Sequence, residues 1–270
     1  LMFAANFFSN GLLFGWIDSF FMGVAGDEQC QLREADGSIC AASMEVSWDE
    51  WWAESRRDRS RAAMDKEVKA MTEKIFKGAD LPRLVRLTDK EVNELTEYEK
   101  KRCLKGRFCL TDKRDGQAKA RIVAQDLKTT NQLPAEEVFA ATPAMSAFRF
   151  MLAASPRSEY VIHTTDFNTA YLQGAPRFPK SYQDSQVVTR RGHILFKLWR
   201  NETNSWEYYD LTGFIYGQQP AGSNWKQTLS SFLESKECGF IESKNAPSTY
   251  FNQESGTRLS VFVDDPVGAS

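Results

Sequence analysis

The sequence has little of the chemistry that small metal-binding modules use. Its 270 residues include only two histidines, His163 and His193, and five cysteines with no C-x-x-C pair among them. Zinc ribbons, zinc fingers and zinc hydrolases need clustered Cys or His ligands, so the sequence argues against these classes. Five irregularly spaced cysteines also argue against a disulfide framework and are typical of reduced thiols inside a cell.

The sequence also lacks a large net charge of either sign. It has 34 Lys and Arg against 36 Asp and Glu, a formal net charge of −2, which argues against a small, uniformly basic nucleic-acid module. The charge is nevertheless uneven. Residues 100–128 contain ten Lys or Arg and three Asp, a net charge of +7, so the rest of the chain carries −9. Apolar residues at 42% and charged residues at 26% are ordinary for one large or two modest globular domains.

The first 25 residues form a long apolar stretch. A membrane-spanning helix needs about 20 such residues, but this stretch has no basic flank and contains Asp18. We therefore favour a buried segment over a membrane anchor, and we do not expect membrane association. Residues 26–46 lack periodicity and are predicted to be a linker. Because the chain begins with Leu1 and ends within an apolar run, we expect a fragment of a longer polypeptide.

Helical patterns dominate the next part of the chain. Ser47 and Glu50 have the spacing of a capping box, and the residues after them predict one long, mostly solvated helix up to about residue 76. The arginine-rich run 56–61 is interleaved with acids, which favours a solvated face over a phosphate contact. A second, shorter helix is predicted from Thr88 to Lys100.

The basic stretch that follows reads as a β-hairpin. One strand is predicted near Arg107–Thr111, a turn contains Asp115 and Gly116, and a second strand is predicted near Ala118–Ala124. A basic two-stranded ribbon is well shaped to hold phosphates. The alternative is an edge hairpin that its lysines keep soluble.

The second half of the chain mixes helices and strands. A helix is predicted over residues 144–155, followed by a strand that ends at Asp166. An amphipathic helix is predicted over Ser223–Phe240, with Ser223 as its cap. Two further strands, over residues 248–253 and 258–265, form a hairpin-like pair. Together these elements predict an α+β fold.

Carboxylates end two of these predicted strands. Asp166 ends one, and Asp264 and Asp265 end another about a hundred residues later. Carboxylates in apolar surroundings cap helices, pair with bases or hold cations, and Mg²⁺ prefers carboxylate oxygen while it keeps positions open for phosphate oxygens. Three carboxylates at adjacent strand ends would suit two-metal nucleotidyl transfer. On spacing alone the signal for a metal site is weak, and a turn or a helix N-cap is the default interpretation of Asp264 and Asp265.

Six sequence blocks narrow this choice. In chain order they are KARIVAQDLK (119–128), EEVFAATPAMSAFRFMLAAS (136–155), TTDFNTAYLQGA (164–175), IYGQQPAGSNW (215–225), NAPSTYF (245–251) and VFVDD (261–265). Together they resemble the reverse transcriptase of copia-type LTR retrotransposons, the pseudoviral branch, over about residues 100–270. The resemblance implies a right-hand polymerase with fingers and palm, an antiparallel palm sheet with helices on one face, and truncation before the thumb. It divides the chain into an apolar segment and linker (1–46), a helical lead-in (47–99) and the polymerase domain (100–270).

The resemblance assigns roles to residues near the carboxylates. Asp166, Asp264 and Asp265 match the catalytic carboxylates and would hold two Mg²⁺ ions, with Mn²⁺ as the alternative. Phe167 follows Asp166 where a backbone carbonyl joins the metal shell. Tyr171 matches the aromatic residue that blocks a ribose 2′-hydroxyl and so selects deoxynucleotides; a core aromatic is the equal alternative.

Other matching positions concern substrate binding. Lys119 and Arg121 match the fingers hairpin and would contact the incoming triphosphate or the template, or would only keep the hairpin soluble. In the fourth block, Pro220 holds the position where the family has a nucleotide-binding Gln. Gln218 and Gln219 lie just upstream and are the candidates for that role.

Two departures concern the catalytic hairpin itself. Phe262 stands where the family usually has Tyr, which removes a hydroxyl near the primer terminus. The chain stops five residues after Asp265. We therefore expect the strand returning from this hairpin, the primer grip, the thumb and RNase H to be absent.

The resemblance implies an RNA-directed DNA polymerase. Its partners would be an RNA template, a DNA primer or duplex, dNTPs and other Gag and Pol products of the element. Its expected location is intracellular, in a cytoplasmic virus-like particle with nuclear import. The alternative is a truncated, non-catalytic remnant that binds nucleic acid through the basic hairpin.

Overall fold

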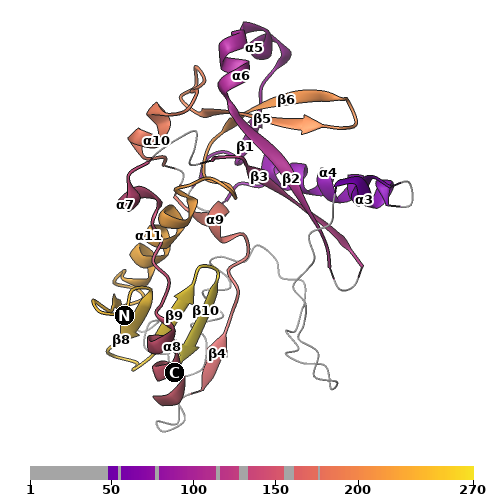
Figure 1. Cartoon of the computed structure of the whole chain (residues 1–270). Helices are drawn as coiled ribbons and strands as arrows, with labels where there is room; N and C mark the ends of the chain where they lie inside the picture. Colours follow the sequence, from indigo (N-terminus) through magenta and orange to yellow (C-terminus); the bar gives the residue numbers. More distant parts are fainter. Residues whose placement is uncertain are drawn as a thin grey trace. The chain divides into compact units, whose positions relative to one another are not determined.

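The computed structural model describes residues 48–53, 56–76, 79–113, 116–127, 133–154, 161–175 and 177–270. These residues form two compact units, each with its own five-stranded sheet (Figure 1). Unit A joins the described residues of 48–127 to 177–218, and unit B joins 133–175 to 219–270. The α+β class is confirmed, and within these residues no helix is long and apolar enough to cross a membrane. The expectations for residues 1–46 and the Ser47 cap lie outside the described residues.

Unit A is built on a mixed sheet. Its elements are α3 (Trp48–Trp52), α4 (Arg57–Glu73), β1 (Leu84–Arg86), α5 (Asp89–Glu94), α6 (Glu97–Arg102), β2 (Leu104–Asp112), β3 (Ala118–Ala124), α10 (Lys180–Asp184), β5 (Ile194–Arg200) and β6 (Ser205–Leu211). The strand order is β1-β6-β5-β2-β3, in which β2 and β5 run parallel and the other neighbours antiparallel. The predicted basic hairpin is confirmed as β2 and β3.

Helix α4 packs against the hairpin and shields the edge strand β3. Its side chains Met64 and Met71 are buried. The carboxylate of Glu67 accepts a hydrogen bond from the backbone N–H of Ile122 on β3, at 3.2 Å. Because β3 is the last strand of this sheet in the part of the chain that the structure describes, Glu67 supplies an acceptor that a further strand would otherwise provide. Burial raises the pKa of the Glu67 carboxyl, and the Ile122 N–H opposes this shift.

The predicted long helix from Ser47 is wrong in one respect. The structure has two helices, α3 and α4, with a break between them, and no Pro or Gly in the sequence marks that break. Arg56 and Arg59, at the start of α4, pair with Asp112 on β2 at 3.0 and 3.3 Å. These arginines therefore join α4 to the hairpin.

The single helix predicted from Thr88 to Lys100 is also wrong, because the structure has α5 and α6 there. Each short helix begins with its own capping box. Thr88 and Glu91 form the first, and Thr96 and Glu99 form the second, in which the Thr96 N–H donates to the Glu99 carboxylate at 2.7 Å. A Thr that caps a new helix cannot lie inside the preceding one, so Thr96 ends the first helix.

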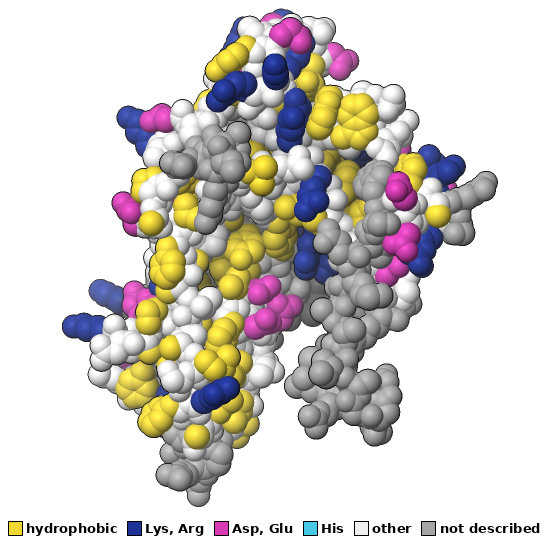
Figure 2. Space-filling model, in the orientation of Figure 1, with side chains coloured by type: hydrophobic (Ala, Val, Ile, Leu, Met, Phe, Trp, Pro, Cys, Tyr) yellow, Lys and Arg dark blue, Asp and Glu magenta, His cyan; other side chains and the backbone are white. Residues whose placement is uncertain are grey.

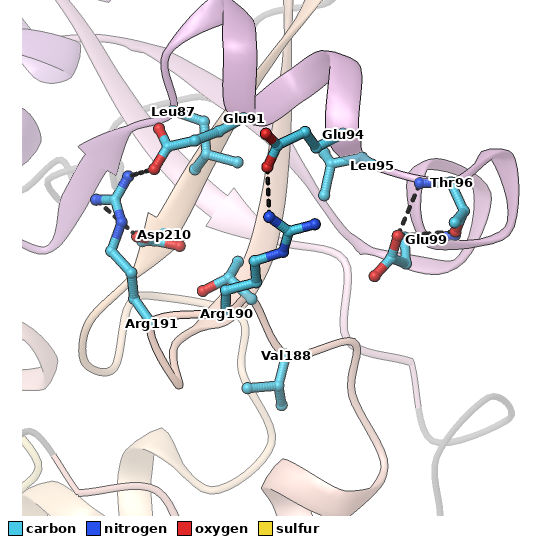
Figure 3. Close-up of a pocket in the computed structure, with 11 residues that line it drawn as sticks. Leu87, Glu91, Glu94, Leu95, Thr96, Glu99, Val188, Arg190, Arg191 and Asp210 are labelled. Atoms are coloured by element: carbon cyan, nitrogen blue, oxygen red, sulfur yellow. Dashed lines mark hydrogen bonds and ion pairs between the residues drawn. The ribbon is translucent and has the colours of Figure 1, made fainter.

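The two short helices and the loop before β5 line an open pocket of about 330 Å³ (Figure 3). Arg190 pairs with Glu94 at 2.5 Å, and Arg191 pairs with both Glu91 and Asp210. Asp210 on β6 is 1% exposed and lies 3.1 Å from Arg191. The two arginines therefore link acidic side chains of α5 and β6 across the pocket.

Unit B is built on an antiparallel sheet. Its elements are α7 (Ala135–Val138), α8 (Met145–Ala154), β4 (Ile162–Thr164), α9 (Ala170–Gln173), α11 (Ala221–Leu233), β7 (Phe240–Glu242), β8 (Thr249–Asn252), β9 (Arg258–Phe262) and β10 (Asp265–Ala269). The strand order is β4-β10-β9-β8-β7. Trp225, Leu229 and Leu233 of α11 pack with Tyr250 and Leu259 of the sheet in one buried core.

Helix α11 is shorter than predicted and begins earlier. It starts after Pro220, whose fixed φ and missing N–H suit a helix start, and it ends at Leu233. Gly239, with a φ of 65°, then turns the chain so that Phe240 begins β7 and enters the core. The helix predicted near 144–155 and the paired strands near 248–265 are confirmed as α8, β8 and β9.

The expectation that the returning strand is absent is wrong. Residues 265–269 form β10, which pairs with β9 on one side and β4 on the other. Pro266 lies in this strand, and its carbonyl accepts a hydrogen bond from Thr165. Its ring nitrogen carries no hydrogen and cannot donate to the sheet, so at this position of β10 the carbonyl alone bonds to the segment after β4. The other pairs of β10 with β4 and β9 hold the strand in the sheet.

The capping box of α5 predicts a pH-dependent contribution to stability. The N–H of Thr88 and the Arg191 side chain lower the pKa of Glu91 from 4.5 to about 2. Because the folded pKa is depressed, the stabilisation by ionised Glu91 is complete above pH 4.5 and is lost as the pH falls towards 2. In urea unfolding, the difference between the wild type and Glu91→Gln should therefore be larger at neutral pH than at pH values below 4.5.

Glu73→Gln is the control for this measurement, because Glu73 is an exposed residue of α4 that makes a loose surface ion pair with Lys69 at 3.8 Å. A difference for Glu91→Gln that stayed constant across this pH range would contradict the assigned role of the ionised carboxylate.

Candidate active site

Two hydrogen bonds bring the predicted carboxylates to one corner of the unit B sheet. The N–H of Thr165 donates to the carbonyl of Pro266 at 3.2 Å, and the N–H of Phe167 donates to the carbonyl of Asp264 at 2.7 Å. Asp166 lies between the two donors, just after β4 rather than at its last residue as predicted. The structure therefore places Asp166 beside Asp264 and Asp265 although about a hundred residues separate them.

The turn that carries Asp264 is tight and strained. Phe262 pairs with Asp265, so Val263 and Asp264 alone connect β9 to β10. Val263 has a φ of 58°, and a β-branched residue in this left-handed region costs about 1–3 kcal/mol. The indole N–H of Trp225 donates to the carbonyl of Val263 at 2.6 Å. Trp225 is 1% exposed, so the core holds the turn in place.

The three carboxylates repel one another. Asp166, Asp264 and Asp265 are all exposed, and the pKa of Asp265 is raised by partial burial and then by the negative charges of Asp264 and Asp166. A bound cation would relieve this repulsion, and carboxylate oxygens are ligands that Mg²⁺ prefers. The donor chemistry therefore fits the predicted metal. Within the described residues, however, no three Cys, His, Asp or Glu side chains are already gathered as a ready-made metal site.

Aromatic residues support this corner from the core. Phe167 is buried and packs edge-on against Trp225, with 5.4 Å between ring centroids. Tyr171, on α9, is half-buried against the same core, and burial and the charge of Asp264 raise its pKa. Tyr171 is thus a core aromatic that also feels the charge of Asp264, and its role in sugar selection stays a prediction.

The remaining predicted residues lie elsewhere. Lys119 and Arg121 are exposed on β3 of unit A, and the Arg121 guanidinium lies 5.4 Å from the centre of the Tyr216 ring. Gln219 is half-buried just before α11 of unit B. Within unit B the structure therefore brings together Asp166, Phe167, Tyr171, Asp264 and Asp265, whereas Lys119, Arg121 and Gln218 belong to unit A.

Gln218 takes part in a buried network of unit A. It is 5% exposed, its amide oxygen accepts from the N–H of Ile215 at 2.7 Å, and its amide nitrogen donates to the Tyr182 hydroxyl at 3.0 Å. That hydroxyl in turn donates to Asp126 at 2.9 Å. Both ends of the Gln218 amide are thus bonded within unit A, and the role of Gln218 in nucleotide binding stays a prediction.

Two residues that support the candidate sites were not assigned a role from the sequence. Trp225 stands at the end of the fourth sequence block, but nothing in that block reveals that its N–H holds the turn before Asp264. Glu67 lies in a charged helical pattern, and only the structure shows it bound to β3. The apolar periodicity predicts that Trp225 lies in a core, but it does not predict the hydrogen bond that Trp225 makes.

One protein family matches this chain. Its description is reverse transcriptase (RNA-dependent DNA polymerase), and the match covers residues 92–270, about two thirds of the chain. The chain belongs to this reverse transcriptase family. The matched segment contains all the predicted site residues in both units. It is therefore an RNA-directed DNA polymerase domain, and a reverse transcriptase acts on a nucleic acid template, a primer and dNTPs.

The hydrogen bond from Trp225 predicts a link between the core and polymerase activity. Trp225→Phe keeps the aromatic contact with Phe167 but removes the donor to Val263, so it should destabilise the protein by about 1–3 kcal/mol. It should also slow primer extension, because the turn that carries Asp264 loses its anchor.

The matched control is Tyr250→Phe, which removes a hydrogen bond of 2.8 Å to Ser230 in the same core but does not touch the turn. The measurements are thermal unfolding and the primer extension rate per folded molecule. Equal extension rates for the two variants would show that Trp225 only stabilises the core.

Proposed function

We propose that this chain is the reverse transcriptase domain of a copia-type LTR retrotransposon of the pseudoviral branch. The six ordered sequence blocks support this assignment within the wider family. The observation that carries the catalytic proposal is the hydrogen bond between Phe167 and Asp264, since it joins the two carboxylate segments. Other Gag and Pol products of the element are the proposed partners, in a cytoplasmic particle with nuclear import.

We assign the antiparallel sheet of unit B to the palm and the basic hairpin of unit A to the fingers. The palm assignment rests on the position of Asp264 in the β9–β10 turn, next to the end of β4. The fingers assignment rests on the exposed Lys119 and Arg121 of β3. The boundaries at residues 46 and 99 stay predictions.

The proposed reaction joins a dNTP to the 3′-hydroxyl of a primer on an RNA template. Asp166, Asp264 and Asp265 would hold two Mg²⁺ ions, or Mn²⁺ in their place. When bound, these ions activate the 3′-hydroxyl and stabilise the leaving pyrophosphate. The chain itself contributes three carboxylates whose mutual repulsion favours cation binding, on a turn that Trp225 holds.

Neighbouring residues would position the substrates. The Phe167 backbone carbonyl would add an oxygen ligand beside Asp166. Tyr171 would lie under the ribose of the incoming nucleotide and exclude a 2′-hydroxyl. Basic and amide side chains would bind the rest of the nucleotide. Lys119 and Arg121 would bind the triphosphate or the template, and Gln218 or Gln219 would contact the nucleotide. Gln219 is half-buried, whereas Gln218 is held in its buried network.

A non-catalytic remnant that binds nucleic acid is the second candidate. The exposed basic side chains of β2 and β3 favour it, because they can bind phosphates without any contribution from the carboxylates. A steep decrease in affinity with rising salt would accompany such binding.

Substitution of the turn carboxylate tests the catalytic proposal. Asp264→Asn should slow Mg²⁺-dependent extension of a DNA primer on an RNA template by about 100-fold or more, since a metal ligand contributes several kcal/mol to the transition state. The melting temperature should stay the same or rise, because the variant relieves repulsion on Asp265. Asp184→Asn, at an exposed site on α10, is the control. If Asp264→Asn extends the primer as fast as the wild type, the catalytic proposal is refuted. If the wild type binds RNA in a salt-sensitive way but does not extend a primer, the non-catalytic remnant is the remaining candidate.

Tyr171 predicts a change in sugar selection. Tyr171→Ala should raise the incorporation of ribonucleotides relative to deoxynucleotides, because the smaller side chain no longer excludes a 2′-hydroxyl. Tyr171→Phe keeps the ring and should keep the selection. The measurement is the ratio of kcat/KM for the two substrates. If Tyr171→Ala lowers the melting temperature but leaves this ratio unchanged, Tyr171 is only a core residue.

A further inference from the structure

One face of the unit A sheet carries exposed basic side chains. Side chains alternate between the two faces of a strand, so the odd-numbered residues of β2 and β3 share a face. On that face Lys105, Arg107, Lys119 and Arg121 are exposed, whereas the even-numbered residues are buried from Leu104 to Leu110 and from Ala120 to Ala124.

The same face continues onto β5 and β6 with two tryptophans. Lys105 pairs with Lys197 in the parallel ladder, so both lie on this face. Two residues further along β5 is Trp199, which pairs with Trp206 on β6. The two rings meet edge to face, 5.2 Å apart, and are 36% and 37% exposed. Two large aromatic side chains are therefore open to solvent beside the basic residues.

Arg107 and Trp199 both follow the end of the parallel ladder between β2 and β5. The last pair of this ladder is Gly106 with Leu198, and Arg107 and Trp199 are the next residue on each strand. Paired strands lie about 4.8 Å apart. Figure 2 shows Lys and Arg side chains over β2 and β3 next to a hydrophobic patch over β5 and β6. We call Lys105, Arg107, Lys119, Arg121, Trp199 and Trp206 the aromatic–basic face.

The tryptophans are held in place before any ligand binds. Lys197 is 6% exposed, and its ammonium group donates to the backbone carbonyl of Lys100 and lies 4.9 Å from the centre of the Trp206 ring. Trp199 packs edge to face with the same ring. A fixed aromatic surface loses little conformational entropy when a flat ring stacks on it.

We propose that the aromatic–basic face binds single-stranded RNA or DNA, with unpaired bases stacked on Trp199 and Trp206 and phosphates held by the four basic side chains. Exposed aromatics beside cations suit single strands, because the bases of a duplex are already stacked on one another and cannot reach the rings. The inference rests on the proposed function in that the bound strand is the polymerase substrate. The binding itself needs neither a metal ion nor the carboxylates of unit B.

The test measures binding of the full chain in EDTA to fluorescent oligo(dT), oligo(rU) and a DNA duplex of equal length. Trp199→Ala/Trp206→Ala should weaken single-strand binding about tenfold, since stacking contributes about 1–3 kcal/mol per base, and should change duplex binding little. Oligonucleotide should quench tryptophan emission in the wild type and less in this variant. Arg107→Ala/Arg121→Ala should instead lower the salt dependence, by about 0.7 in slope per lost phosphate contact.

Matched variants separate stacking from folding. Phe150→Ala removes an exposed aromatic of unit B, and Lys90→Ala removes an exposed cation of α5; neither should alter binding. Trp199→Phe/Trp206→Phe keeps aromatic rings and should restore most of the affinity that the alanine variant loses. Unchanged single-strand affinity in the alanine variant, or an equal loss for single strand and duplex, would overturn the proposal.

The same experiment distinguishes this inference from the catalytic proposal. Asp264→Asn should bind oligonucleotides in EDTA as tightly as the wild type. If the wild type does not extend a primer, but substitution of the two tryptophans weakens single-strand binding, only the catalytic proposal fails. If it extends a primer and the tryptophan variant binds normally, only this inference fails. A difference between the oligo(dT) and oligo(rU) arms identifies the preferred strand.

Discussion

The hydrogen bond from the N–H of Phe167 to the carbonyl of Asp264 is the contact on which the candidate active site depends. It joins the segment after β4 to the β9–β10 turn, and so gathers carboxylates that repel one another. Neither the repulsion nor the left-handed φ of Val263 is favourable by itself. The core stabilises the corner against both, because the indole N–H of Trp225 donates to the carbonyl of Val263 in the strained turn, and the ring of Phe167 packs on Trp225.

In unit A the exposed feature is the edge strand β3. This strand must expose basic side chains without offering its backbone hydrogen-bonding groups to another chain. Glu67 accepts from the N–H of Ile122, and the carbonyl of Tyr216 accepts from the N–H of Ala124 at 2.7 Å. The outer hydrogen-bonding groups of β3 are thus partly occupied, and the strand can present Lys119 and Arg121 on its open face.

Local patterns allowed part of this structure to be predicted. The hairpin β2–β3, helix α8 and the pair β8–β9 follow from alternation, apolar spacing and turn residues. Element ends were less predictable: Thr96 starts a helix inside a continuous helical pattern through its capping box with Glu99, and Pro266 lies within a strand that was expected to be absent. Tertiary contacts decide the second case, because β4 and β9 pair with β10 from either side. The burial of Gln218 likewise depends on Tyr182, which is distant in the sequence.

The family match begins at residue 92, yet unit A begins earlier. Strand β1 pairs with β6, and α4 supplies Glu67 to β3 and two arginines to Asp112. A recombinant fragment trimmed to the matched segment would turn β6 into an edge strand, uncover the face that buries Met64 and Met71, and remove Thr88, the cap of α5. Sequence similarity marks where the polymerase chemistry is recognisable, and the folding unit that supports it is larger.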